Sequence, residues 1–251
     1  MDFDGTLYSH SLGKIPDSSV EALKTLKDKG FLVFLCTGRS LPELKDFELK
    51  DLTFSGKILL NGQIICDEND AVVCRRPIEG ELKERLVSFF QNRNVPLFFA
   101  AEDDNFLNYV DEHVIHVQKE VSSVPPHLGE YNGEDFYMAT AFVGTVEQLE
   151  RIMSLNDIAE VTYWHEGACD IVPKGISKSV GIKEALKIWN IDSKETMAFG
   201  DGDNDVEMLE ECAIGIAMGN SYEAVKKHAD YVTDDIDEDG LYNALKHFEL
   251  I

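Results

Sequence analysis

The stretch FLVFLCTGR, residues 31–39, indicates which type of fold the chain adopts. Residues 31–35 form an uninterrupted apolar run that is too short for a helix and is bounded by Gly30 and by Thr37-Gly38. Such a run is typical of a strand buried on both faces of a parallel sheet. The preceding residues, 16–30, carry apolar side chains on one helical face, and Ser18 and Glu21 have the spacing of a capping box. Helix and buried strand in succession predict an α/β fold.

The same alternation continues on both sides of a long middle segment. Further strands are predicted at 57–60, 196–199, 214–218 and 231–232, a hairpin at 64–66 and 71–74, and helices at 180–189, 206–212 and 241–248. Asn220 and Glu223 are predicted to cap another short helix. We expect one Rossmann-like, doubly wound parallel sheet with its reactive groups at the carboxyl ends of the strands.

The middle segment has a different texture. It contains a predicted helix at 79–92, strands at 95–101 and 136–143, a polar stretch through His116, a helix at 145–154 that begins with a Thr145/Gln148 box, and a hairpin at 160–172. A length of 251 residues exceeds one average domain and falls short of two. We therefore expect a core formed by residues 1–77 and 177–251, with an α+β cap domain inserted at 78–176.

Charge and composition exclude several classes of partner. The chain carries 23 Lys and Arg against 47 Asp and Glu, a net charge of −24, which repels nucleic acid and anionic lipid. No apolar run approaches the roughly 18 residues of a membrane span, and the first 30 residues lack the basic and apolar regions of a secretion signal. The 5 cysteines form no C-x-x-C pair, so we expect reduced thiols and a cytoplasmic location, without a zinc ribbon or a disulfide framework.

Acidic side chains follow two of the predicted core strands. Asp2 and Asp4 lie at the first strand, and Asp201 and Asp205 follow a later one. Carboxylates that converge at one sheet edge raise one another's pKa values unless a cation separates them. Mg²⁺ suits such a cluster because it prefers oxygen ligands, and the Lys178 ammonium can reach the same edge. A bound metal and Lys178 also supply the positive charge that an anionic substrate needs on this acidic protein.

The two acidic motifs could instead be solvated turns or calcium loops. A calcium loop starting at Asp201 has Val206 where glycine is needed and Cys212 where a bidentate Glu is needed. The run Asp235, Asp237, Asp239 and Gly240 fits better, but its last ligand position holds Lys246. The calcium interpretation therefore fails at both places.

Four motifs in order resemble those of the haloacid dehalogenase superfamily. They are Asp2-Phe3-Asp4-Gly5-Thr6, Cys36-Thr37-Gly38-Arg39, Ser177-Lys178 and Gly200-Asp201-Gly202-Asp203-Asn204-Asp205. Asn61-Gly62 and Ala217-Met218-Gly219-Asn220 also match secondary signatures of that superfamily. More narrowly, the chain is similar to the Cof-type phosphatases, which carry an inserted α/β cap.

The resemblance implies catalytic roles for four residues. Asp2 is expected to attack phosphorus as the nucleophile and Asp4 to act as the acid and then the base. Thr37 is expected to bind the transferring phosphoryl group, and Lys178 to offset the negative charge on Asp2 and phosphate. Ser179 follows Lys178 where the family usually has glycine, so Lys174 remains a rival to Lys178.

The resemblance also implies the binding residues. Mg²⁺ is expected to be held by Asp2, the Asp4 carbonyl, Asp201 and Asp205. The substrate-binding set is expected to comprise Thr37, Gly38, Arg39, Asn61, Lys178 and Asn204. Two other features have plainer interpretations: His165 as an exposed turn residue, and Phe89, Phe90, Phe98 and Phe99 as cap core.

The expected function is Mg²⁺-dependent hydrolysis of a small phosphorylated metabolite, such as a sugar phosphate, through an aspartyl phosphate. The alternatives are a phosphomutase with a similar cap and a non-catalytic module that binds a phosphometabolite. The start of the chain carries one more expectation. The strand that bears Asp2 should be central, yet only Met1 precedes it, so we expect a chain extended upstream by apolar residues to be more stable.

Overall fold

The structure is a computed structural model that describes residues 1–49, 51–120 and 126–251. The chain divides into two compact units. The first, the core unit, comprises Met1–Arg39, Glu43–Arg75 and Ser177–Ile251, and the second, the inserted unit, comprises Ser40–Pro42 and Arg76–Ile176. The α/β fold class predicted from the sequence is confirmed, with parallel strands in the core unit and an antiparallel sheet in the inserted unit.

The strands of the core unit form two hydrogen-bonded groups. One has the order β1-β2-β3-β4 and the other β10-β11-β12. Their bounds are β1 Phe34–Cys36, β2 Gly56–Leu59, β3 Ile64–Asp67, β4 Val72–Arg75, β10 Met197–Gly200, β11 Ile214–Ala217 and β12 Tyr231–Val232. The β1–β2, β10–β11 and β11–β12 pairs are parallel, whereas β3 and β4 form the predicted antiparallel hairpin.

Met1 and Asp2 connect these two groups. The Met1 amino group donates to the Phe34 carbonyl oxygen at 3.0 Å, and Cys36 N donates to the Met1 carbonyl oxygen at 2.8 Å. On the other side, Asp2 N donates to the Phe199 carbonyl oxygen at 2.9 Å. The segment bearing Asp2 thus lies between β1 and β10.

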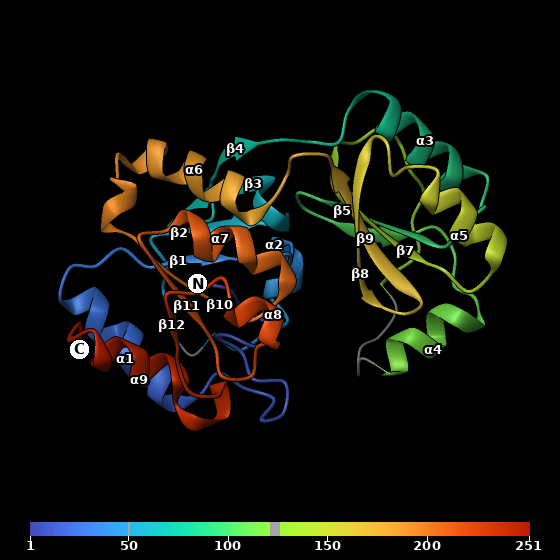
Figure 1. Cartoon of the computed structure of the whole chain (residues 1–251). Helices are drawn as coiled ribbons and strands as arrows, with labels where there is room; N and C mark the ends of the chain where they lie inside the picture. Colours follow the sequence, from blue (N-terminus) through green and yellow to red (C-terminus); the bar gives the residue numbers. More distant parts are fainter. Residues whose placement is uncertain (50, 121–125) are drawn as a thin grey trace. The chain divides into compact units, whose positions relative to one another are not determined.

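Helices cover both faces of the core strands (Figure 1). On one face α1 packs beside α9, and on the other α6 packs beside α7 and against β2 and β3. The helices and 3₁₀ turns of this unit are α1 Asp17–Asp28, α2 Leu41–Leu44 (which crosses the unit boundary), η1 Leu60–Gly62, α6 Lys178–Trp189, η2 Ser193–Glu195, η3 Asp203–Asp205, α7 Val206–Glu211, α8 Glu223–Lys226, η4 Ile236–Glu238 and α9 Gly240–His247.

The inserted unit is an antiparallel sheet with helices. Its strand order is β6-β5-β7-β9-β8. The bounds are β5 Leu97–Ala101, β6 Asn105–Leu107, β7 Phe136–Phe142, β8 Ala159–His165 and β9 Ala168–Pro173, with helices α3 Gly80–Gln91, α4 Glu112–Glu120 and α5 Val146–Met153. The predicted capping box is present, because Thr145 Oγ1 accepts from Gln148 N and the Gln148 side chain accepts from Thr145 N.

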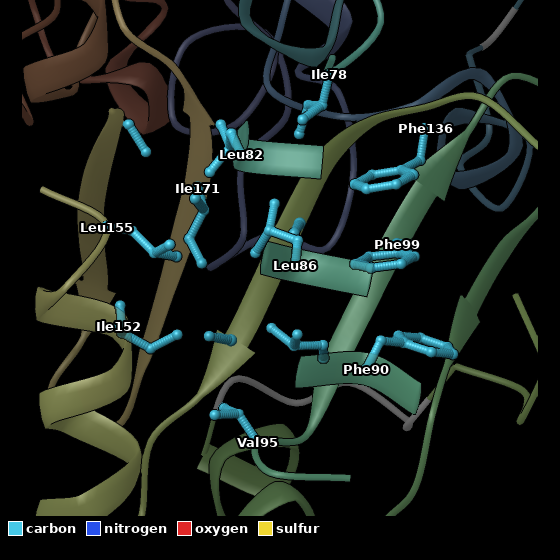
Figure 2. Packing of buried hydrophobic residues seen from close by; sticks show 14 of the residues in the cluster. Ile78, Leu82, Leu86, Phe90, Val95, Phe99, Phe136, Ile152, Leu155 and Ile171 are labelled. Carbon is cyan, nitrogen blue, oxygen red and sulfur yellow. The ribbon is translucent and has the colours of Figure 1, made fainter. Parts of the chain in front are cut away.

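An aromatic and aliphatic cluster fills the space between this sheet and its helices (Figure 2). Phe99 is stacked on Phe136 with ring centroids 3.9 Å apart and on Phe90 at 4.4 Å. Phe90, Phe98 and Phe99 are buried and Phe89 packs against the cluster from its edge. The interpretation of these four phenylalanines as core is confirmed.

Some local predictions were wrong for identifiable reasons. Phe31 and Leu32 are exposed and precede the strand, because Phe31 N donates to the Leu26 carbonyl oxygen at 3.0 Å and so closes α1. Ser18 does not cap α1, because the N-cap of that helix is Pro16. The Ser18 hydroxyl donates to Asp239 instead.

Two further differences from the predictions concern the cap of α8 and the polar stretch through His116. Helix α8 begins after Tyr222 without a side-chain cap, so neither Asn220 nor Glu223 caps it as predicted. The polar stretch before His116 contains β6 and α4, which were not predicted. Asp111 Oδ1 accepts from Val114 N at 2.9 Å at the start of α4, and this cap followed by Val114 and Val117 is the signal that could have revealed the helix.

Candidate active site

The carboxyl ends of the core strands bring the motif residues together. Thr37 follows β1 and its N–H donates to the Ile58 carbonyl oxygen of β2 at 2.9 Å. Asp201 follows β10, beside Met1–Asp2. Because parallel strands end at one edge, residues far apart in sequence become neighbours there.

Lys178 joins two carboxylates from distant parts of the chain. It is the first residue of α6, and its Nζ lies 2.5 Å from Asp2 Oδ1 and 2.6 Å from Asp205 Oδ1. All three side chains are buried, Lys178 to 1% exposure. The rival Lys174 is exposed and belongs to the inserted unit. Lys178 is thus the lysine that the structure places next to Asp2.

The buried carboxylates strongly perturb one another. Burial first, and then the charge of Asp205, raises the pKa of Asp2 to about 8 despite the opposing effect of Lys178. Burial likewise raises the pKa of Asp201 to about 6, although a hydrogen bond from Thr6 acts against the rise. Burial lowers the pKa of Lys178, but the two neighbouring carboxylates outweigh burial and raise it. The site holds more negative charge than one ammonium balances.

This arrangement fits a divalent cation. Carboxylate oxygens of Asp2, Asp201 and Asp205 lie within 4.8 Å of one another. Burial and the neighbouring carboxylates raise the pKa of Asp2 and Asp201, and a hard cation among them offsets both effects. Oxygen donors are those that Mg²⁺ prefers. The predicted metal ligands Asp2, Asp201 and Asp205 are therefore brought together by the fold.

Backbone geometry holds these carboxylates in place. Asp205 Oδ2 accepts from the N–H groups of Asp201 and Gly202, both at 3.0 Å. Gly5 has φ of 75°, and a Cβ there would lie 2.2 Å from Asp201 Oδ2. Only glycine therefore allows the first motif to approach Asp201 this closely.

Asp4 has a different environment from Asp2. Arg39 donates to both oxygens of Asp4, from Nε to Oδ2 and from Nη2 to Oδ1, and each distance is 2.7 Å. His10 Nε2 lies 2.9 Å from Asp4 Oδ1. Burial raises the pKa of Asp4, but the hydrogen bonds from His10 and Arg39 outweigh burial and lower it to about 2. Arg39, predicted to bind substrate, is here the partner of Asp4.

The remaining predicted binding residues lie around Thr37. Thr37 Oγ1 accepts from Arg39 N at 3.1 Å, and the Thr37 carbonyl oxygen accepts from Asn61 N at 3.1 Å. Asn204 Nδ2 donates to Asn61 Oδ1 at 3.3 Å. A Cβ on Gly38 would lie 3.3 Å from Asn61 Oδ1. The four predicted binding residues Thr37, Gly38, Asn61 and Asn204 therefore lie close together.

Three residues that contact the site had no predicted role in it. Thr6 Oγ1 donates to Asp201 Oδ1 at 2.7 Å, His10 contacts Asp4, and Asn220 Nδ2 donates to the Gly5 carbonyl oxygen at 2.8 Å. Thr6 and Asn220 stand inside quoted motifs, which was the available signal. His10 follows its motif in a turn without any distinguishing pattern. The interpretation of His165 as an exposed turn residue was wrong: it is the last residue of β8 and is half-buried, because its Nε2 lies 2.9 Å from Glu120 Oε2 of α4.

The helices were also compared with the length and hydropathy of a membrane span. No helix within 1–49, 51–120 and 126–251 is long and apolar enough to cross a membrane.

Comparisons with known proteins agree with the motifs. The family model for haloacid dehalogenase-like hydrolases matches residues 1–245. YkrA of Bacillus subtilis (strain 168) is 33% identical over 255 residues, which cover 100% of this chain and 96% of YkrA.

Solved structures are similar over the same extent. BT1666 from Bacteroides thetaiotaomicron, described among the phosphatases of this superfamily, matches with a TM-score of 0.88 and 30% identity, covering 100% of this chain and 94% of its own. BT4131, described as a subclass IIB sugar phosphatase, matches with a TM-score of 0.83 and 33% identity, covering 100% and 98%. The chain therefore belongs to the haloacid dehalogenase-like hydrolases, as its motifs predict, and it is an enzyme of the phosphoric monoester hydrolase class.

Proposed function

We propose that the chain is a Mg²⁺-dependent phosphatase that hydrolyses a small phosphorylated metabolite through an aspartyl-phosphate intermediate. The observation that carries this proposal is the contrast between two carboxylates two residues apart. Asp2 is buried against Lys178 beside Asp201 and Asp205, whereas Asp4 is held separately by Arg39 and His10. This contrast supports the assignment of Asp2 as the nucleophile and of Asp4 as the group that transfers protons.

In the first step an Asp2 oxygen attacks phosphorus and the bond from phosphorus to the alcohol oxygen breaks. Asp4, in its protonated form, gives its proton to the leaving oxygen and becomes a carboxylate. Lys178, at 2.5 Å from Asp2, holds the nucleophile and balances part of the charge on the phosphoryl group. Thr37 donates its hydroxyl hydrogen to that group.

In the second step water attacks the phosphorus of the aspartyl phosphate. Asp4 takes the proton of the attacking water, and the bond from phosphorus to the Asp2 oxygen breaks. The products are inorganic phosphate and the regenerated Asp2 carboxylate, while Asp4 is again protonated. The pKa of Asp4, held at about 2 by His10 and Arg39, favours the base form, which this second step requires. The acid form in the first step therefore requires that Arg39 leave Asp4 and bind the phosphate of the substrate, which raises the pKa of Asp4.

Asp2, Asp201 and Asp205, with the Asp4 carbonyl, are proposed to hold Mg²⁺. When bound, the ion supplies positive charge that neutralises phosphate and aligns it with the nucleophile. The carboxylate geometry supports this assignment, since the three side chains present oxygens within 4.8 Å of one another.

We assign substrate selection to residues 78–176. A sugar phosphate is the preferred class, supported by the similarity to a solved sugar phosphatase and by a net charge of −24, which disfavours nucleic-acid substrates.

The test is a phosphate-release screen over sugar phosphates and aryl phosphates, with Mg²⁺ or with EDTA. Release that requires Mg²⁺ and disappears in Asp2→Asn is the expected result. No release from any substrate by the wild-type protein would contradict the proposal. A product that retains its phosphate at a new position would instead identify a phosphomutase.

A further inference from the structure

His10 lies in a short, closed turn directly after the first motif. Ser9 N donates to the Lys14 carbonyl oxygen at 3.0 Å, and Lys14 N returns a bond to the Ser9 carbonyl oxygen at 3.2 Å. Ser9 Oγ accepts from Leu12 N at 3.1 Å inside the turn. Both ends of the turn are thus fixed, and the position of His10 is defined by backbone hydrogen bonds.

A second part of the chain anchors this turn. Ser9 Oγ donates to Asp237 Oδ1 at 2.5 Å, and the Ser11 hydroxyl donates to Asp237 Oδ2. Asp237 belongs to η4, Ile236–Glu238. The backbone N–H of Asp237 donates to Asp235 Oδ1 at 2.9 Å. Asp237, one of the aspartates in the rejected calcium loop, therefore holds the hydroxyls on both sides of His10.

Aromatic rings support the side chains that reach Asp4. The His10 ring packs edge-on against Tyr8 with centroids 5.4 Å apart, and Tyr8 packs edge-on against Phe47 at 4.8 Å. The Arg39 guanidinium lies 4.5 Å from the centroid of the same Phe47 ring. His10 and Arg39 thus approach Asp4 from one continuous aromatic support.

Two side chains, Arg39 and His10, bond to the Asp4 carboxylate, and they differ in what else they can bind. Arg39 follows Thr37 and Gly38, and a guanidinium there can also bind the phosphate of a substrate. His10 Nε2 donates to Asp4 Oδ1 at 2.9 Å and belongs to the anchored turn. If Arg39 binds phosphate, His10 still keeps the Asp4 carboxyl in its orientation, since among the described residues its Nε2 also contacts that carboxyl.

We propose that His10 is a positioning residue for Asp4, which fixes the orientation in which Asp4 protonates the leaving oxygen. The inference rests on the proposed function of Asp4 as acid and base. His10 itself transfers no proton to substrate and forms no bond with it. A carboxyl group that is misplaced by about 1 Å loses much of its effect on proton transfer.

This role has a signature that a purely structural role lacks. Protonation by Asp4 matters most when the leaving oxygen is strongly basic and least when the leaving group departs readily. Phenyl phosphate and p-nitrophenyl phosphate are close in size but differ in the basicity of the oxygen that leaves. Loss of Asp4 orientation should therefore slow phenyl phosphate more than p-nitrophenyl phosphate.

The experiment compares kcat and KM for both aryl phosphates, with Mg²⁺, in the wild type and three variants of His10. His10→Ala removes the donor, His10→Phe removes the donor but keeps a ring against Tyr8, and His10→Gln restores an N–H donor. His228→Ala is the matched control, because His228 is exposed and bonds a carboxylate, Glu210, at 2.6 Å away from Asp4. Melting temperatures establish that each variant is folded.

We expect His10→Ala and His10→Phe to lower kcat/KM for phenyl phosphate about 10-fold, with less than about a 3-fold change for p-nitrophenyl phosphate. This ratio is the readout because it reports cleavage of the ester bond and not the later hydrolysis of the aspartyl phosphate, which both substrates share. His10→Gln should recover most of the loss, and His228→Ala should behave as wild type. Equal losses on both substrates, no loss in either donor-free variant, or no recovery in His10→Gln would overturn the inference. Failure of the wild type to hydrolyse either ester contradicts the proposed function itself and is distinguishable from these outcomes.

Discussion

Two buried polar side chains, Asn108 in the inserted unit and Asp2 in the core unit, have opposite environments. In the inserted unit Asn108 is buried with each of its polar atoms bonded: its Nδ2 donates to the Phe90 and Val95 carbonyl oxygens, and its Oδ1 accepts from Leu97 and Tyr109 N–H groups. In the core unit Asp2 is buried beside other carboxylates, and its pKa is raised to about 8. A buried polar group whose hydrogen bonds are all made stabilises a fold, whereas crowded buried charges are typical of a site where a ligand neutralises them.

The largest expected effect comes from removing the nucleophile. Asp2→Asn should lower kcat by at least about 10³-fold, because an amide is a poor nucleophile and a poor metal ligand. Its melting temperature should not fall, since the change relieves carboxylate repulsion. Phosphate release and thermal unfolding are the measurements. Turnover retained within 10-fold would show that the crowded carboxylate is not the nucleophile.

Asp4→Asn is the matched control for that variant. It should also lose turnover but keep its stabilisation by Mg²⁺, because the proposed metal contact of Asp4 is its backbone carbonyl. Equal loss of the Mg²⁺ effect in both variants would contradict the assigned roles.

Lys178→Met tests the balance of charge in the core unit. It leaves Asp2 and Asp205 buried without their shared cation, which should cost about 3–5 kcal/mol in unfolding free energy and lower kcat strongly. Urea unfolding with EDTA present measures the first effect. Lys174→Met is the control and should change neither quantity, because Lys174 is exposed.

Phe99→Ala tests the other unit. Phe99 is fully buried between Phe90 and Phe136, so its truncation should cost about 3–5 kcal/mol through lost burial and a cavity. Phe89→Ala, at the edge of the same cluster, should cost clearly less. Urea unfolding distinguishes the two. Equal losses would mean that the cluster is not the centre of stability of this unit.

The smallest expected effect is a pH dependence confined to the metal-free protein. The folded pKa values of Asp2, about 8, and Asp201, about 6, lie above their ordinary value of 3.8, so the folded state binds more protons between these limits. Stability from these groups is therefore full below about pH 4 and is lost as the pH rises through 6 and 8. The melting temperature in EDTA should fall from pH 5 to pH 8, by roughly 2–4 °C for each kcal/mol of stability lost.

Added Mg²⁺ should raise the melting temperature more at pH 8 than at pH 5, because the carboxylates must lose protons to bind it. Asp2→Asn should flatten the upper part of the slope in EDTA. A slope of opposite sign, or one that Asp2→Asn leaves unchanged, would show that these carboxylates do not control it.

Sequence alone determined the features that depend on short-range order. The alternation of apolar runs and helical segments predicted the α/β fold, the Thr145/Gln148 box predicted the start of α5, and the order of four motifs predicted the family. The positions of Asp2, Asp4 and Asp201 at the ends of predicted strands marked them as candidates, and the resemblance of the motifs implied the roles of Asp2, Asp4, Thr37 and Lys178.

Tertiary structure decided which of these side chains touch. Arg39 binds Asp4, Asp237 binds Ser9 across 228 positions, and Ser18 donates to Asp239 rather than capping α1. A polar side chain takes whichever partner the packed fold brings near, and local sequence encodes only the partners within a turn or two. His10 illustrates the limit, since nothing beside it in the sequence indicates the contact with Asp4 that the closed turn creates.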